Sequence, residues 1–284
     1  MTVQKHASGP LIIGATGAVG QALARCWPAA AGPGLWQHRP ASAPGLAAQF
    51  PGPTLAWDIL ATKLPPVPRG LSGMIVLAGV MGQDEEALAQ NTDIALAAVA
   101  AAQEAGLTRV LIASTQAVYG TDQICVSETD LCQPTSPYGQ AKLRMEQALA
   151  GLPNVTNLRL GNVAGADSLF RAAGQGTMIL DRFADGSSPQ RSYIGPVTLA
   201  RVLSRLLDPD LVLPSVVNVA HPGVIPMDAI LNAAGVPFEW RAAPATALHK
   251  LEIDVTRLNT LVPMPSVSAA QLVAEAASCG WSAA

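Results

Sequence analysis

Tyr138 and Lys142 could do acid–base chemistry, and they lie four positions apart in the stretch Tyr-Gly-Gln-Ala-Lys. Positions four apart share one face of a helix, so a helix over 136–150 would direct both side chains into one cleft. A neighbouring ammonium stabilises a phenolate and lowers the pKa of tyrosine from about 10. Such a tyrosine can exchange a proton with a substrate hydroxyl or carbonyl near neutral pH. A chance pair on a helix surface is the alternative interpretation.

Two hydroxyl side chains, Ser114 and Thr115, follow the apolar run Val110-Leu111-Ile112-Ala113. This run predicts a buried strand over 109–114, and open α/β sheets bind ligands beyond the carboxyl ends of their strands. Either hydroxyl could hydrogen-bond the oxygen that Tyr138 protonates. The alternative is that both only shape the turn after the strand.

Three glycines, Gly14, Gly17 and Gly20, directly follow the apolar run of residues 10–13 and open a helical pattern over 18–28. The first permits a tight turn, the second a close approach of backbone to a pyrophosphate, and the third close packing of helix on strand. The free N–H groups of the helix start would then face the phosphates. This context predicts dinucleotide binding, and a tight turn without a ligand is the alternative.

These groups must be positioned by alternating strands and helices. We expect strands at 10–14, 34–38, 54–58, 73–78, 109–114 and 155–160, with helices at 18–28, 83–105 and 136–150. Continuous apolar strands separated by helices indicate an α/β fold with a Rossmann-like, doubly wound parallel sheet. We expect residues 1–165, plus about 196–220, to form the dinucleotide-binding domain. Residues 166–195 and 221–284 would form a small C-terminal substrate-binding lobe.

The second strand ends in Trp-Gln-His-Arg, without the acid that usually holds the ribose hydroxyls of NAD. Arg39 could pair with a 2′-phosphate instead, which favours NADP over NAD. Asp58 could accept a hydrogen bond from the adenine amino group, or could cap a helix. The predicted cofactor-binding residues are Gly14, Thr16, Gly17, Ala18, Val19, Gly20, Arg39, Asp58, Ile59, Leu77, Ala78, Gly79, Ser114, Tyr138 and Lys142.

Four ordered motifs together resemble the extended short-chain dehydrogenase/reductase family of NAD-dependent epimerase/dehydratase type. They are GATGAVG at 14–20, STQAVYG at 114–120, SPYGQAK at 136–142 and LRLGNVAG at 158–165. The resemblance implies that Thr115, Tyr138 and Lys142 are catalytic. It implies that Asn162 contacts a substrate near its diphosphate and that Arg191 binds the diphosphate. Asn91 also matches an asparagine of the family.

The resemblance implies an oxidoreductase or isomerase that transfers hydride at a sugar or nucleotide-sugar carbon, as an epimerase or a net reductase. Thr115 is followed by Gln116 and Ala117 rather than the acidic pair of many dehydratases, which makes dehydration less favoured. Ser192 follows Arg191 where the family often has aspartate. The alternatives are a reductase or dehydrogenase of another small carbonyl or sugar acid, and a non-catalytic dinucleotide sensor.

Composition argues against other classes of partner. Net charge is −3, and the chain has no basic run that would suggest nucleic acid. No stretch of about 18 unbroken apolar residues suggests a membrane span. The four histidines do not cluster, so we expect no metal site. We expect a cytoplasmic protein, and the family resemblance implies a homodimer formed through helices 83–105 and 136–150.

Overall fold

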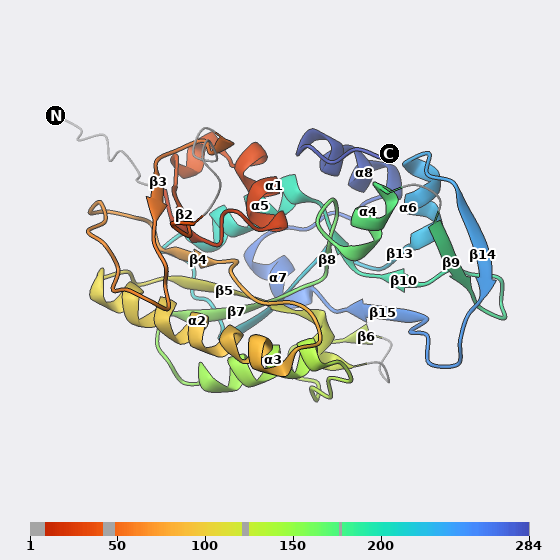
Figure 1. Cartoon of the computed structure of the whole chain (residues 1–284), viewed down its shortest axis with the longest axis horizontal. Coiled ribbons are helices and arrows are strands. Elements are labelled where there is room, and N and C mark those ends of the chain that lie inside the picture. Colours follow the sequence, from red (N-terminus) through yellow and green to blue (C-terminus); the bar gives the residue numbers. More distant parts are fainter. Residues whose placement is uncertain (1–8, 42–48, 121–124, 176–177, 284) are drawn as a thin grey trace.

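A seven-stranded parallel sheet forms the centre of the computed structural model, which describes residues 9–41, 49–120, 125–175 and 178–283 (Figure 1). The strand order is β12-β7-β5-β4-β1-β2-β3, so the chain leaves β1 in one direction and returns to its other side with β4. The strands are β1 (Leu11–Ile13), β2 (Leu35–His38), β3 (Thr54–Ala56), β4 (Met74–Val76), β5 (Val110–Thr115), β7 (Val155–Leu160) and β12 (Val216–Val219).

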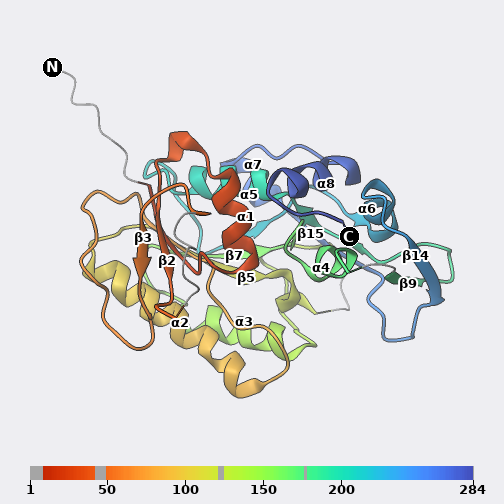
Figure 2. The same cartoon turned by 45° about the horizontal axis from the view of Figure 1, so that its top comes forward.

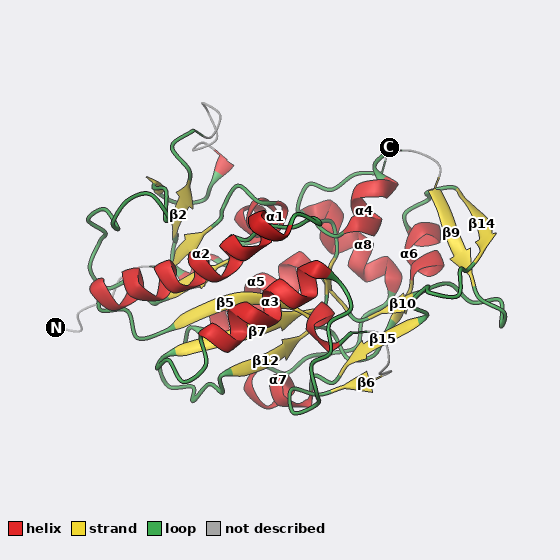
Figure 3. Cartoon of the chain, turned by 60° about the horizontal axis from the view of Figure 1, so that its bottom comes forward, coloured by secondary structure: helices red, strands yellow, loops and turns green. Residues whose placement is uncertain are grey.

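Helices cover both faces of this sheet, as the sequence predicts for a doubly wound fold. α2 (Glu85–Glu104) and α3 (Pro137–Ala148) lie side by side on one face, seen in front of the strands in Figure 3. α1 (Ala18–Cys26) and α5 (Pro196–Leu206) cover the other face. The predicted fold class is therefore confirmed.

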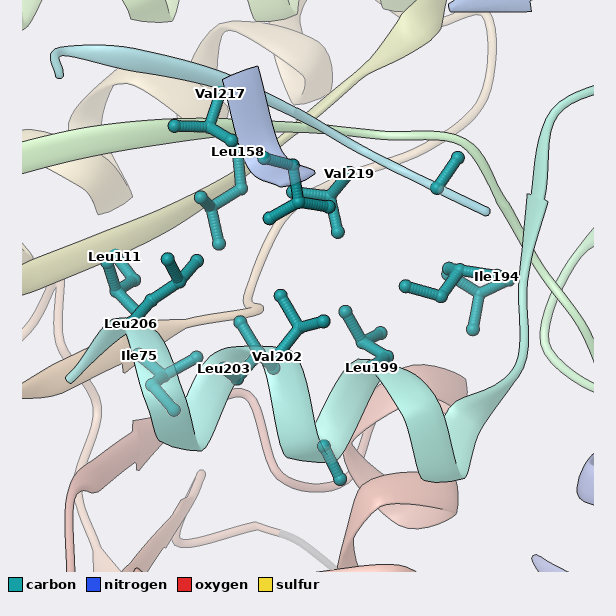
Figure 4. Packing of buried hydrophobic residues seen from close by; sticks show 14 of the residues in the cluster. Ile75, Leu111, Leu158, Ile194, Leu199, Val202, Leu203, Leu206, Val217 and Val219 are labelled. Atoms are coloured by element: carbon teal, nitrogen blue, oxygen red, sulfur yellow. The ribbon is translucent and has the colours of Figure 1, made fainter. Parts of the chain in front are cut away.

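The packing of α5 on the sheet shows why the apolar residues of this region form a helix and strands. Leu199, Val202, Leu203 and Leu206 recur at helical spacing on α5 and point at the sheet (Figure 4). Ile75, Leu111, Leu158 and Val217, from four neighbouring strands, meet them in one buried cluster (Figure 4). Burial of this apolar surface holds α5 against the sheet.

α3 begins at a capped end, and this start fixes the positions of the predicted acid–base pair on the helix. The Ser136 hydroxyl accepts a hydrogen bond of 3.1 Å from the backbone N–H of Gly139, and Pro137 occupies the first helical turn. Tyr138 consequently lies in the first turn and Lys142 one turn later. Met145 of the same helix packs into the core below the sheet.

A smaller lobe lies at the end of the molecule away from β3 (Figure 2). It contains α4 (Ser168–Ala173), α6 (Met227–Ala233) and α8 (Ala269–Ser278), with the parallel pair β9 (Met178–Arg182) and β14 (Phe238–Ala242). Short strands join it to the large sheet: β6 (Cys125–Val126), β8 (Asn162–Val163), β10 (Gln190–Arg191), β11 (Tyr193–Ile194), β13 (Ile225–Pro226) and β15 (Lys250–Ile253).

One part of the predicted lobe packs differently from the rest. Leu251, Ile253 and Val255, with Leu258 of α7 (Thr256–Leu261), belong to the same buried cluster as α5 and the large sheet. The apolar residues of the short strands in this region have no clear period in the sequence. Only the tertiary contacts therefore identify these segments as strands. In the described ranges, no helix is both long and apolar enough to cross a bilayer.

Candidate active site

A cavity of about 520 Å³ opens above the carboxyl ends of β1, β2, β3 and β4. It lies where the chain reverses direction across the sheet, the place at which such sheets bind ligands. Nine of the predicted cofactor-binding residues line it: Gly14, Thr16, Gly17, Arg39, Asp58, Ile59, Leu77, Ala78 and Gly79. Gln37, Leu60, Val80, Gln90 and Ile94 also line it, and the sequence prediction did not include them.

The turn from Gly14 to Gly17, called the glycine turn below, lines this cavity. Gly14 has φ of +85°, and a Cβ there would lie 2.5 Å from the backbone nitrogen of Ala78, so only glycine fits. Gly17 caps α1 without a side-chain hydrogen bond, which leaves the first N–H groups of the helix available. A pyrophosphate fits such a helix start by hydrogen bonding and by charge.

Gln37, at the end of β2, braces the glycine turn. Its Oε1 accepts a hydrogen bond of 2.8 Å from the Gly14 backbone N–H, and its Nε2 donates one of 2.5 Å to the carbonyl of Trp57. The side chain is only 3% exposed, so the amide links β1, β2 and the end of β3 in a dry environment. A polar residue inside the apolar run 34–38 was the sequence signal for this role.

Arg39 and Asp58 are the charged side chains among the residues that line the cavity. Asp58 Oδ1 accepts a hydrogen bond of 3.1 Å from the Leu60 backbone N–H, so the carboxylate shapes the turn after β3 while facing the cavity. The turn role and the predicted adenine contact are thus compatible. Arg39 is exposed at the rim.

The remaining predicted cofactor residues lie outside the lining. Ala18, Val19 and Gly20 belong to α1, where a Cβ at Gly20 would lie 2.5 Å from the carbonyl oxygen of Ala15. Gly20 therefore serves the packing of the helix start, as the motif predicts. Ser114 lies in a buried network described below.

Lys142 connects the cavity to α3. A Cβ at Gly79 would lie 3.1 Å from Lys142 Nζ, so the ammonium lies directly beneath a residue of the cavity wall. Nζ donates a hydrogen bond of 2.9 Å to the carbonyl of Ala113 on β5. Burial lowers the pKa of Lys142 from 10.5 to about 8, although the charge of Glu146 opposes this shift.

This lowered pKa predicts a pH-dependent stability. Between pH 8 and 10.5 the unfolded chain retains the Lys142 proton that the folded protein has lost. The unfolded state then binds more protons, so the free energy of unfolding rises with pH in this window. We expect a rise of up to about 3 kcal/mol relative to the Lys142→Met variant. Urea unfolding of both proteins across this window measures it, and a constant difference between them would contradict the lowered pKa.

The expected effect of Lys142 on Tyr138 is wrong in this structure. Burial raises the pKa of Tyr138 to about 12, the opposite of the predicted lowering. Burial of the phenol is the cause, and the Lys142 ammonium hydrogen-bonds the carbonyl of Ala113 on β5. Tyr138 is therefore a protonated phenol at neutral pH, suited to donating a proton.

Thr115 ends β5, and the short helix that follows it packs against α3. Its Oγ1 accepts a hydrogen bond of 3.2 Å from the Ala117 backbone N–H and caps the short helix η3 (Gln116–Tyr119). This helix touches α3 closely, since a Cβ at Gly139 would lie 2.5 Å from the Ala117 carbonyl oxygen. The fold thus brings Thr115, Tyr138 and Lys142 to adjoining elements at the carboxyl end of the central strand.

Ser114 points to the other side of β5, into a buried polar network. Its hydroxyl donates a hydrogen bond of 2.5 Å to Glu146, whose carboxylate is paired with Arg159 at 2.7 Å. Arg159 also donates to the Tyr119 hydroxyl at 3.0 Å, and that hydroxyl donates to Asn218 on β12 at 2.7 Å. Ser114 therefore joins α3 to the sheet.

The other residues that the family resemblance singled out have internal partners. Asn91, on α2, exchanges hydrogen bonds with the backbone N–H and carbonyl of Val80 and so holds the loop after β4. Asn162 bonds Gln116 and Asp167 at the ends of β5 and β7. Arg191 donates to backbone carbonyls within the lobe.

The structure has a Rossmann-like fold with a cavity at the strand ends, and Lys142 lies near the wall of this cavity. Residues 75–213 match the family model described as NAD dependent epimerase/dehydratase family. This portion of the chain includes Thr115, Tyr138, Lys142 and Asn162. This match confirms the predicted resemblance over these residues.

Known epimerases are similar to this chain in sequence or in fold. A UDP-glucose 4-epimerase of Azospirillum brasilense is 36% identical over 115 residues, which are 38% of this chain and 32% of that protein. The chain thus aligns with about a third of this curated relative. A solved UDP-glucose 4-epimerase of Stenotrophomonas maltophila, with NAD and formylated UDP-arabinopyranose, shares the fold at a TM-score of 0.78 and 17% identity, covering 95% of this chain and 96% of that one.

A UDP-glucuronic acid 4-epimerase from Bacillus cereus, solved with UDP-glucuronic acid and NAD, gives a TM-score of 0.75 at 19% identity. The match covers 95% of this chain and 98% of that structure. At these identities the two structures establish the fold.

Proposed function

We propose that this protein is an NAD(P)-dependent oxidoreductase or epimerase that transfers hydride at a carbon of a sugar or nucleotide sugar. The observation that carries the proposal is the position of Lys142 Nζ under Gly79, which joins the dinucleotide-sized cavity to the catalytic helix. The family match and the names of the relatives support the reaction class.

Each residue of the proposed site then has a defined role. The glycine turn and the start of α1 would hold the pyrophosphate. The nicotinamide, when bound, supplies or accepts the hydride. In the reducing direction Tyr138 would donate the proton to the substrate oxygen, because its raised pKa keeps the phenol protonated. In the oxidising direction the Tyr138 phenolate would accept the proton of the substrate hydroxyl. Thr115 would hydrogen-bond the same oxygen, and a homodimer through α2 and α3 is part of the proposal.

The cofactor is proposed to be NADP rather than NAD. The end of β2 offers the neutral amide of Gln37, and its Oε1 already accepts from Gly14. Arg39 lines the cavity at the same strand end and can pair with a 2′-phosphate. The solved structures cited above contain NAD, so the preference depends on these two side chains of this chain.

Titration with NADH and NADPH, followed by nicotinamide fluorescence, tests two claims. The first is that the protein binds a dinucleotide, and the second is that it prefers NADP to NAD. We expect NADPH to bind more tightly, and Arg39→Ala to weaken NADPH by about tenfold while changing NADH little. Arg69→Ala, at an exposed arginine outside the cavity lining, is the matched control.

The other outcomes of these titrations distinguish the alternatives to this proposal. Equal loss of NADH and NADPH affinity in Arg39→Ala would contradict its role at the 2′-phosphate. Tighter binding of NADH by the unmodified protein, or NAD that co-purifies with it, favours an epimerase that retains NAD. Binding of neither nucleotide would remove the basis of the proposed function.

A further inference from the structure

Asn218 joins the large sheet to the short strands of the lobe. The residue lies on β12 with its side chain fully buried, and Nδ2 donates hydrogen bonds of 3.1 and 3.0 Å to the backbone carbonyls of Val126 and Asp254. Val126 ends β6, and Asp254 directly follows β15, the partner of β6. Both hydrogens of the amide nitrogen are engaged by these carbonyls, so Oδ1 is the atom left for the Tyr119 hydroxyl.

The two strands that Asn218 holds belong to a sheet of the order β13-β10-β15-β6, called the lobe sheet below. Arg191 lies on β10 of this sheet, opposite Leu251 of β15. The family resemblance assigns Arg191 to the diphosphate of a substrate. The position of the lobe sheet would therefore set where such a substrate lies relative to the large sheet.

The buried polar network leads from Asn218 to α3 and β5. The Tyr119 hydroxyl donates to Asn218 Oδ1 at 2.7 Å and accepts from Arg159 at 3.0 Å. Arg159 is paired with Glu146 on α3, and Ser114 on β5 donates to the same carboxylate. Each of these side chains is at most 6% exposed, so solvent is largely excluded from their contacts.

Ser114 lies between Ala113 and Thr115 on β5. The carbonyl of Ala113 accepts the hydrogen bond of the Lys142 ammonium, and Thr115 carries the hydroxyl proposed for the substrate oxygen. Glu146 lies one turn after Lys142 on the same face of α3. The network therefore holds the end of β5 and α3 in one arrangement.

We propose that Asn218 is a positioning residue, which holds the lobe sheet in place relative to Lys142 and Thr115 through the buried polar network. The inference rests on the proposed function, since it assumes that these two residues act on a substrate held by the lobe. Loss of the amide would let the lobe sheet shift against α3, and a misplacement of about 1 Å in a bound substrate lowers kcat strongly. The nucleotide Kd should stay unchanged, because none of the network residues lines the cavity.

A double-mutant cycle between Asn218 and Tyr119 tests this role. Tyr119→Phe removes the hydroxyl that links the two ends of the network, while Asn218 keeps its contacts with the lobe carbonyls. We expect Asn218→Ala and Tyr119→Phe each to lower kcat by at least about tenfold on the best substrate among D-glucose, D-galactose and their UDP-linked forms. The double variant should lose no more than the larger single loss, because either change interrupts the same network.

Asn157→Ala is the matched control. Asn157 is a buried amide on β7, the neighbour of β12, and it lies outside the network, with Oδ1 lacking a hydrogen-bond partner among the described residues. We expect this variant to keep the kcat of the unmodified protein.

Lys142 provides a readout that needs no substrate. The chain has four lysines, so few signals appear in the NMR spectrum of protein labelled with ¹³C at lysine Cε, and Lys142→Met assigns the signal. Because Glu146 lies one turn after Lys142, displacement of the network should move this signal. We expect Asn218→Ala and Tyr119→Phe both to move it, and Asn157→Ala to leave it in place.

The inference is overturned if kcat or the Lys142 signal stays at its unmodified value in Asn218→Ala. Losses of kcat that add in the double variant also overturn it, because the two residues would then act independently. If Asn218→Ala does not fold, Tyr119→Phe takes its place, since phenylalanine keeps the ring and its packing. A protein that turns over none of these substrates contradicts the proposed function, and the Lys142 signal then tests the inference by itself.

Discussion

Replacing Tyr138 with phenylalanine should lower kcat by about 10²–10⁴-fold, the usual contribution of a positioned proton donor. The phenol has a pKa of about 12, so the native residue enters each cycle protonated at neutral pH. Phenylalanine keeps the ring and its packing but cannot donate a proton. The Kd for NADPH or NADH should stay nearly unchanged, because the cavity is formed by the strand ends and the glycine turn.

The measurement is steady-state turnover on the best substrate from a panel of D-glucose, D-galactose and their UDP-linked forms. Gln140→Ala, an exposed position of the same helix, is the control. Full turnover by Tyr138→Phe would show that another group supplies the proton. A native protein that binds nucleotide but turns over no substrate would instead favour the dinucleotide sensor.

The largest effect on stability is expected at the buried ion pair between Glu146 and Arg159. Their side chains are 5% and 7% exposed and lie 2.7 Å apart. Glu146→Gln leaves the Arg159 guanidinium buried without a counter-charge, and removal of one partner of such a pair costs about 3–5 kcal/mol. Folded proteins are stable by only about 5–15 kcal/mol, so a large part of the total would be lost.

Urea unfolding of Glu146→Gln and Arg159→Met measures this cost. The control is Arg241→Met, which breaks the exposed pair of Arg241 with Asp181 and should cost less than about 1 kcal/mol. The double variant Glu146→Leu/Arg159→Met should cost less than the sum of the single changes, because no buried charge is left unpaired. If Glu146→Gln costs no more than Arg241→Met, the network through Ser114 and Tyr119 does not stabilise the sheet as argued.

The sequence by itself was sufficient for the local features. The period of apolar residues predicted β7 over Val155–Leu160 and placed α2 and α3 to within two residues at each end. Gly14 and Gly17 were recognisable because a φ of +85° and an uncapped helix start demand small residues at fixed spacing. Motifs confined to one strand–turn–helix unit leave their pattern in consecutive residues.

Only the tertiary structure decided what depends on neighbours distant in the chain. It turned Ser114 toward Glu146, raised the pKa of Tyr138 and placed Lys142 under Gly79. It also closed the Gln116–Asn162 contact, which spans 46 positions. Burial and hydrogen-bond partners set these properties, and both arise from packing between elements whose order across the sheet differs from their order in the chain.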